Sequence, residues 1–181
     1  KTPVCDFGKK AEDFKLKSIE NKHISLNDVK GEKATLIMFI CNHCPYVKAI
    51  IRDLAKDCNE LKKDGINSVA IMSNDTNNYP EDSFDNMIKF AKANDFGEMN
   101  YLIDETQEIA RKYGAVCTPD FFGYNKDLEL QYRGRFRELR DLKPLLSGDS
   151  DLKVAMKMIS KTQAGPKEQT PSMGCNIKWF N

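Results

Sequence analysis

The chain has 181 residues, of which 40% are hydrophobic and 30% are charged, and its formal net charge is +1. This length and composition are typical of one globular domain, and the balanced charge argues against nucleic acid or an anionic membrane as a partner. The apolar runs are far shorter than the ~20 residues that span a bilayer. We therefore expect a single domain over residues 1–181 in the cytoplasm. A periplasmic or secreted location is the alternative, because the chain starts without a methionine and a leader can have been removed.

The first predicted elements are a β-hairpin and a buried strand. A turn at 18–21 separates two short segments in which apolar and polar residues alternate, which is the pattern of a half-buried hairpin. A continuous apolar run at 34–40 predicts the first buried strand. We therefore expect residues 1–33 to form an N-terminal extension that carries the hairpin.

The next segment has the pattern of a strand–helix–strand unit. Apolar residues recur every three or four positions from Pro45 to Leu61, which predicts a helix that Gly65 ends. Residues 66–72 form another apolar run and predict a second buried strand. Because the connection is long and helical, we expect the two strands to be parallel, with a right-handed crossover.

The second half of the chain alternates between helix and strand and then changes to a hairpin. The predicted elements are helices at 83–94, 105–113 and around 152–159, a strand at 99–103, and two antiparallel strands at 121–124 and 128–133. Residues 161–181 are predicted to form a C-terminal tail whose first part is flexible by composition. Together these elements predict an α/β fold with a mixed central sheet flanked by helices.

The most informative motif, Cys41-Asn42-His43-Cys44-Pro45, lies where the first buried strand ends and the helix begins. Two thiols at this spacing at a helix start are typical of a redox site, because free backbone N–H groups and the positive end of the helix dipole stabilise a thiolate. His43 can place positive charge beside whichever sulfur ionises. We predict that Cys41, His43 and Cys44 are catalytic; the alternative for His43 is a solvated loop residue.

Metal binding is a competing hypothesis for this motif. A structural zinc site normally has four ligands, with a second Cys or His pair at similar spacing, and the sequence has no second pair of this kind. The other cysteines and the second histidine are scattered singly: Cys5, Cys58, Cys117, Cys175 and His23. A module in which Cys41, His43 and Cys44 hold copper or zinc is kept as an alternative. No organic cofactor is expected, because the sequence has no glycine-rich phosphate-binding motif.

Three segments resemble the peroxiredoxin-like, thioredoxin-domain branch of the alkyl hydroperoxide reductase and thiol-specific antioxidant (AhpC/TSA) superfamily. They lie at 39–47, 117–122 and 171–179 and contain the two-cysteine motif, a Cys-Thr-Pro-Asp-Phe-Phe sequence and a Met-Gly-Cys sequence. The resemblance implies a thioredoxin-like fold in which Pro119 follows a cis peptide bond and faces the two cysteines across the active site. It also implies that the backbone of Thr118 is available to pair with an extended substrate chain.

The resemblance further implies a redox enzyme with no bound cofactor. Its electrons would come from a dithiol protein or a small thiol, and its substrate would be a protein disulfide or a peroxide. In a thiol-disulfide oxidoreductase, which is the function that we predict, Cys41 attacks and Cys44 resolves. In a peroxiredoxin-like antioxidant enzyme, which is the alternative, Cys44 reduces the peroxide and Cys41 or Cys175 resolves. The oligomeric state is left open.

The sequence departs from the peroxiredoxin signature at one important position. Cys41 stands where that signature has a threonine, whose hydroxyl orients the peroxide better than a thiol can. An equivalent of the peroxiredoxin arginine is also not found beside Pro119, since Asp120 follows it and Arg133 and Arg135 lie beyond the next turn. Both departures favour disulfide exchange over peroxide reduction.

The remaining cysteines are expected to have different roles. Cys58 continues the apolar stripe of the first long helix, so we expect it to be a small core residue. Cys117 either lies near the active-site pair or packs beneath it. Cys175 precedes an apolar cluster that can dock the tail, and it is either a resolving or regulatory thiol or merely an exposed one.

Overall fold

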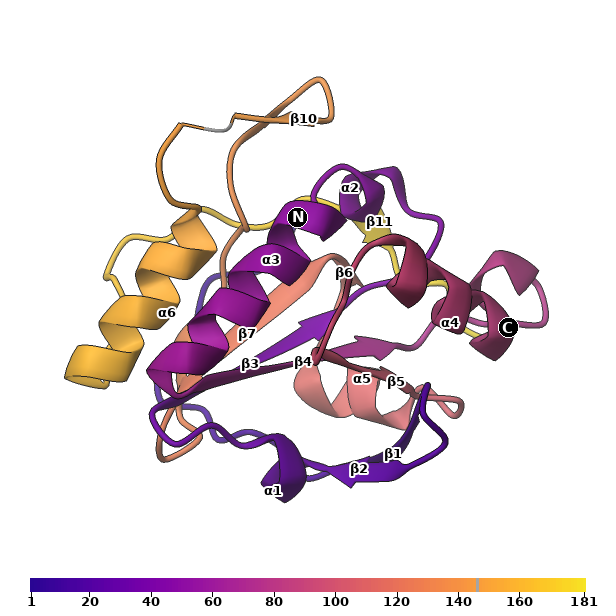
Figure 1. The fold of residues 1–181 in the computed structure, drawn as a ribbon, viewed down its shortest axis with the longest axis horizontal. Helices are drawn as coiled ribbons and strands as arrows, with labels where there is room; N and C mark the ends of the chain where they lie inside the picture. The colour runs from indigo at the N-terminus through magenta and orange to yellow at the C-terminus, as the bar shows by residue number, and fades with distance from the viewer. Residues whose placement is uncertain (146) are drawn as a thin grey trace.

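The computed structural model describes residues 1–145 and 147–181 and is built on a seven-stranded mixed sheet with the order β2-β1-β5-β4-β3-β7-β8 (Figure 1). The strands are β1 (Lys15–Ser18), β2 (His23–Ser25), β3 (Ala34–Phe39), β4 (Ile66–Met72), β5 (Asn100–Ile103), β7 (Asp120–Asn125) and β8 (Leu130–Tyr132). A mixed sheet flanked by helices is what the sequence predicts, and the α/β class is confirmed.

The pairing of the strands matches the predicted connections. β1 and β2 form an antiparallel hairpin, and β3 runs parallel to β4, in the expected crossover. β4 is also parallel to β5, whereas β3 pairs antiparallel with β7, and β7 with β8. All six residues of β3 are buried, because this strand lies in the middle of the sheet with helices over both faces.

Helices cover the two faces of the sheet and enclose two hydrophobic clusters (Figure 1). They are α1 (Leu26–Val29), α2 (Pro45–Lys48), α3 (Ile51–Leu61), α4 (Phe84–Ala93), α5 (Glu108–Tyr113) and α6 (Asp151–Thr162). Alternate residues of β3 serve the two clusters: Leu36 and Met38 pack with residues of α3 and α6, while Ile37 and Phe39 pack with residues of α1 and α5.

Two predicted helices differ from the structure at their boundaries. The helix expected from Pro45 onward is broken between α2 and α3, because the Ile50 N–H bonds to the carbonyl of Val47 three residues back. The predicted stop holds: a short 3₁₀ helix, η1 (Lys62–Asp64), ends at Gly65, whose φ of 76° is left-handed. α5 begins at Glu108, later than predicted, because Gln107 is itself left-handed and stands just outside the helix.

The C-terminal tail is hydrogen-bonded to the domain, a contact that the composition of its first part did not predict. The Gln169 side-chain amide donates to the carbonyl of Gln131, and the Ser172 hydroxyl donates to the carbonyl of Pro119. Further along, β11 (Cys175–Asn176) pairs antiparallel with β6 (Cys117–Thr118). Two more short strands, β9 (Leu139–Arg140) and β10 (Lys143–Pro144), and the 3₁₀ helix η2 (Pro80–Asp82) complete the described elements. None of the described helices is long and apolar enough to cross a membrane.

Candidate active site

The two-cysteine motif lies at the C-terminal end of the central strand β3. Cys41 and Cys44 are both buried, with exposures of 1% and 0%. Cys44 is the N-cap of α2, and Pro45 occupies the first position inside the helix. Proline fits there because it needs no hydrogen-bond acceptor at that position and its φ is already helical. The sequence therefore fixes one cysteine at the start of the helix, where free N–H groups favour an anion.

The sulfur of Cys44 has two close polar partners. Its Sγ lies 2.9 Å from the Sγ of Cys175 and 3.2 Å from the carbonyl oxygen of Thr118, which accepts when Cys44 is a thiol. Donation from the Cys41 thiol, then from Cys175 and from the backbone N–H of Val47, lowers the pKa of Cys44 well below its ordinary value. These donors outweigh the burial of the sulfur, which acts in the opposite direction.

The pKa of Cys41 is shifted in the opposite direction, above its ordinary value. Donation of its proton to Cys44, burial, and the negative charge of Asp82 all raise the pKa of Cys41, although the Thr118 hydroxyl at 3.4 Å from its Sγ acts against them. Together with the place of Cys44 at the start of α2, these shifts favour Cys44 as the thiol that ionises first. The sequence-based assignment of the attack to Cys41 and of resolution to Cys44 stays a prediction, which Cys-to-Ser variants can test.

Cys175 completes a cluster of three thiols. It reaches Cys44 because β11 pairs with β6, in a register that places Cys175 opposite Thr118. Burial, followed by its hydrogen bond to Cys44, raises the pKa of Cys175 to about 11. Cys175 is half-buried, and all six cysteines of the chain are free thiols in this structure. The structure places Cys175 in contact with Cys44, and its role as a resolving or regulatory thiol stays a prediction.

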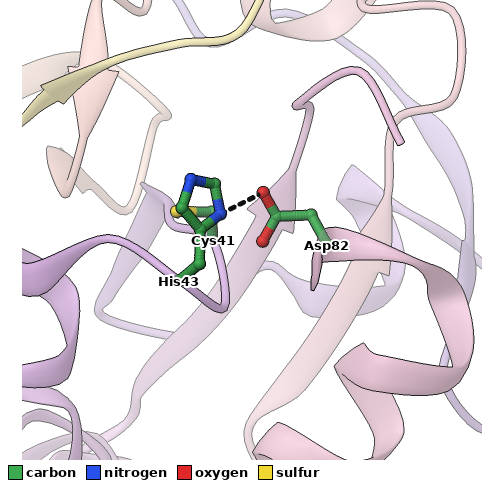
Figure 2. A group of neighbouring side chains, drawn as sticks. All are labelled: Cys41, His43 and Asp82. Carbon is green, nitrogen blue, oxygen red and sulfur yellow. Dashed lines mark ion pairs between the residues drawn. The ribbon is translucent and has the colours of Figure 1, made fainter. Parts of the chain in front are cut away.

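His43 is paired with a carboxylate that sequence reasoning did not single out (Figure 2). Its Nδ1 lies 2.7 Å from Oδ2 of Asp82, a close ion pair whose geometry is not that of a directed hydrogen bond, and its ring stacks on Tyr79. Asp82 is 0% exposed and accepts hydrogen bonds from the Asn42 N–H and the Asn74 side-chain amide. Asp82 ends η2 just before a helix, where an acidic residue is common, so the sequence carried no signal for it.

The same residues form the candidate metal-binding group of the described chain. Ligand atoms of Cys41, His43 and Asp82 lie within 4.8 Å of one another, as Figure 2 shows. This set differs from the one expected from the sequence, because Asp82 takes the place of Cys44, whose sulfur faces Cys175 instead. Both oxygens of Asp82 already accept hydrogen bonds or pair with His43, so a metal would have to displace existing contacts.

Thr118 and Pro119 lie beside the cysteine cluster, and the peptide bond between them is cis, which confirms the expectation. The loop that carries them is braced by a buried ion pair: Asp120, 0% exposed, accepts from the Arg133 guanidinium at 3.1 and 2.9 Å. Arg135 is likewise paired, with Asp151 at 2.6 Å. Both arginines beyond the hairpin turn thus have carboxylate partners.

Cys117 and Cys58 are buried away from the reactive cluster. Cys117 packs beneath the cis-proline loop, with its Sγ 3.5 Å from the carbonyl of Pro119, and burial raises the pKa of Cys117 to about 12. Cys58 lies on the core side of α3, as predicted, and burial raises the pKa of Cys58 to about 12 as well. Neither thiol is available as a thiolate near neutral pH.

Mild oxidation is therefore expected to leave Cys58 reduced while the thiols around Cys44 become bridged. The inaccessible, protonated Cys58 thiol cannot compete with three clustered thiols, one of which ionises readily. Peptide mapping after oxidation with a small disulfide would check this. Finding Cys58 in a bridge while Cys44 remains free would contradict the assignment.

Comparisons with known proteins identify the family of the chain and support its fold. A family model described as the AhpC/TSA family matches residues 7–136, while no curated protein matches the chain. An uncharacterized conserved protein of Geobacillus kaustophilus is 39% identical, with a TM-score of 0.91, over 99% of this chain and 98% of its own. A hypothetical protein of Sinorhizobium meliloti 1021 is 36% identical, with a TM-score of 0.89, over 99% and 97%.

A more distant structure carries a functional description. A thiol:disulfide interchange protein of the thioredoxin family, from Chlorobium tepidum TLS, is 18% identical, with a TM-score of 0.64, over 84% of this chain and 97% of its own. At this identity the similarity concerns the fold alone. It confirms the thioredoxin-like fold that the three sequence segments implied.

Proposed function

Because the chain belongs to the AhpC/TSA family, we propose that it is a thiol-disulfide oxidoreductase in which the Cys44 thiolate makes the first attack. The observation that carries this proposal is the position of the Cys44 sulfur, at a helix start and 2.9 Å from the sulfur of Cys175. A thiol at a helix start can attack a disulfide, and a second thiol in contact with it can resolve the mixed disulfide that forms.

The proposed reaction moves two electrons from the protein to the substrate. The Cys44 thiolate attacks one sulfur of a substrate disulfide, which forms a mixed disulfide and releases the other substrate sulfur as a thiolate. Cys175 or Cys41 then gives up its proton and attacks the Cys44 sulfur, which releases the second substrate thiolate and leaves a disulfide within the protein. A dithiol protein or a small thiol reduces this disulfide and restores the three thiols.

His43 and Asp82 are proposed to serve the second step. Cys41 holds its proton firmly, so it needs a proton acceptor before it can attack the Cys44 sulfur. The imidazole of His43 belongs to the same group of side chains as Cys41, and its Nδ1 lies 2.7 Å from the Asp82 carboxylate. In this account His43 takes the proton of Cys41, and Asp82 is a positioning residue.

Peroxide reduction is the second candidate, because Cys44 also has the features of a peroxide-reducing thiolate. In that reaction Cys44 attacks the O–O bond and becomes a sulfenic acid, releasing an alcohol or water, and the Cys175 thiol condenses with it to a disulfide and a second water. Two observations favour disulfide exchange. Cys41 occupies the threonine position, and the guanidiniums of Arg133 and Arg135 are paired with carboxylates.

Side-by-side assays of the purified protein distinguish these functions and the metal hypothesis. With a dithiol donor present, we expect reduction of the insulin disulfides, slow consumption of hydrogen peroxide, and no stoichiometric copper or zinc. Rapid peroxide consumption without insulin reduction would establish the peroxidase instead. Bound metal that blocks alkylation of Cys41 would favour the metal-binding module. Cell fractionation of the native host, followed by detection of this protein in each fraction, tests the predicted cytoplasmic location.

A further inference from the structure

We propose that the chain's own tail occupies the β6 edge beside Pro119 as a built-in substrate, and that this edge accepts only glycine directly before the reacting cysteine. The inference rests on the proposed function and adds a substrate class to it. The external substrates are extended peptides in which a glycine directly precedes the disulfide-bonded cysteine, as Gly174 precedes Cys175 in the tail. Such peptides and the tail compete for one edge.

The tail pairs with β6 in the way that an additional strand pairs with the edge of a sheet. Cys175 is paired with Thr118 and Asn176 with Cys117, in an antiparallel register. Strand addition to a free edge is a common way to bind an extended peptide, since backbone hydrogen bonds supply affinity and side chains supply specificity. In this register the cysteine of the added strand is delivered to the attacking sulfur, with 2.9 Å between the Sγ atoms of Cys175 and Cys44.

Gly174 shows why the edge selects glycine at the preceding position. A Cβ at Gly174 would lie 2.1 Å from the carbonyl oxygen of Thr118 and 2.6 Å from its carbonyl carbon. These are backbone atoms held by the cis-proline loop, so they cannot move aside as the end of a flexible side chain could. A peptide with any other residue before its cysteine would have to bind in a different register or farther from Cys44.

The tail is fastened on both sides of Cys175, so an external peptide must displace it. On one side, the Ser172 hydroxyl donates to Pro119 and the Ser172 N–H donates to the Thr2 hydroxyl. On the other side, the Lys178 N–H donates to the Asn74 side chain, and the Lys178 carbonyl accepts from the Gln107 amide. With the tail in place Cys44 is 0% exposed, so a peptide disulfide reaches it only after the tail moves.

An adjoining cavity has room for the part of the peptide that precedes the glycine. Its volume is about 340 Å³, and its walls include Tyr46, Pro119, Phe136 and Leu139. Met173, which precedes the glycine in the tail, is 59% exposed and forms part of the same wall. The residue two positions before the substrate cysteine would therefore lie at the edge of this cavity, as Met173 does.

The test compares two disulfide peptides on the full-length protein. One peptide has the tail sequence Ser-Met-Gly-Cys-Asn-Ile and the other has valine in place of glycine, and each carries a chromogenic aromatic thiol on its cysteine. Attack by Cys44 on the peptide sulfur releases the chromogenic thiolate and leaves the peptide bound. We expect the glycine peptide to react at least about tenfold faster than the valine peptide. Equal rates would overturn the proposal.

Variants of the tail test the competition. Gly174→Val should drive the tail from the edge and accelerate the reaction of the glycine peptide by at least about tenfold relative to Lys167→Val, an exposed control in the same tail. Ser172→Ala, which removes the hydrogen bond to Pro119 without a steric clash, should act in the same direction. Unchanged rates in both variants, with thermal stability retained, would contradict the competition.

A small disulfide separates this inference from the function on which it rests. Oxidised 2-mercaptoethanol has no peptide backbone and does not need the β6 edge. If Gly174→Val, in which the tail no longer covers Cys44, fails to react with this reagent at Cys44, the proposed function fails. If the protein reacts with the reagent but does not discriminate between the peptides, the peptide-binding edge alone is refuted.

Discussion

Replacing Cys44 with serine is expected to abolish disulfide exchange, with a rate loss of at least roughly a thousandfold. The variant loses the thiol that ionises most readily, and the two thiols that remain around it, Cys41 and Cys175, have raised pKa values. Stopped-flow reduction of a small disulfide would measure the loss. Cys58→Ser is the matched control, because that thiol is buried and takes no part in the reaction.

The Cys41→Ser variant should behave differently from Cys44→Ser. Its first attack stays intact, and Cys175 can still resolve the mixed disulfide. The double variant Cys41→Ser/Cys175→Ser should trap the mixed disulfide on Cys44, which mass spectrometry would detect, since no resolving thiol is left. The reverse result, with loss of all reactivity in Cys41→Ser and trapping in Cys44→Ser, would restore the assignment expected from the sequence.

Arg133→Met is expected to lower the free energy of unfolding by about 3–5 kcal/mol. The arginine pairs with buried Asp120, donates to the carbonyl of Gly114 and lies over the ring of Phe122. Its removal leaves a buried carboxylate without a counter-charge. Burial already raises the pKa of Asp120, and a folded-state pKa above the unfolded value gives stability that is lost as the pH rises through the folded pKa. The destabilisation caused by Arg133→Met should therefore be larger at a pH above the folded-state pKa of Asp120 than at a pH below it.

Urea unfolding at two pH values would measure this effect. Arg52→Met is the control, because Arg52 is exposed and only donates to the carbonyl of Ala93, so we expect a change within about 0.5 kcal/mol. Adding Asp120→Asn to Arg133→Met should recover part of the loss, since the unpaired charge is then removed. A loss of less than about 1 kcal/mol in Arg133→Met would show that the ion pair does not brace the cis-proline loop.

The fold was predictable where the sequence pattern is local. The apolar run of β3, the helical spacing after Pro45 and the left-handed Gly65 all depend on neighbouring residues, and the structure has each of them. The break between α2 and α3 was not predictable, because the apolar spacing continues through it without interruption. Composition did not predict the contacts of the tail, because Gln169 and Ser172 bond to residues that are distant in the sequence.

The sequence pointed to the two-cysteine motif, but not to which of its two thiols has the lower pKa. The two-cysteine spacing identified Cys41 and Cys44, and the resemblance identified Pro119. Which thiol ionises depends on tertiary neighbours: Cys175, which comes from 131 residues away, and Asp82, whose carboxylate bonds to the N–H of a residue 40 positions earlier. No spacing rule relates residues at such distances, so the order of the pKa values could come only from the structure.

The central claim, that Cys44 is the thiolate of the resting protein, is tested most directly by a pH titration of the ultraviolet absorbance of thiolates. The reduced wild-type protein should contain about one thiolate at about pH 6, where an ordinary thiol contributes almost none. Cys44→Ser should lose this absorbance, while Cys41→Ser and Cys58→Ser should keep it. Absorbance that disappears in Cys41→Ser and persists in Cys44→Ser would contradict the account.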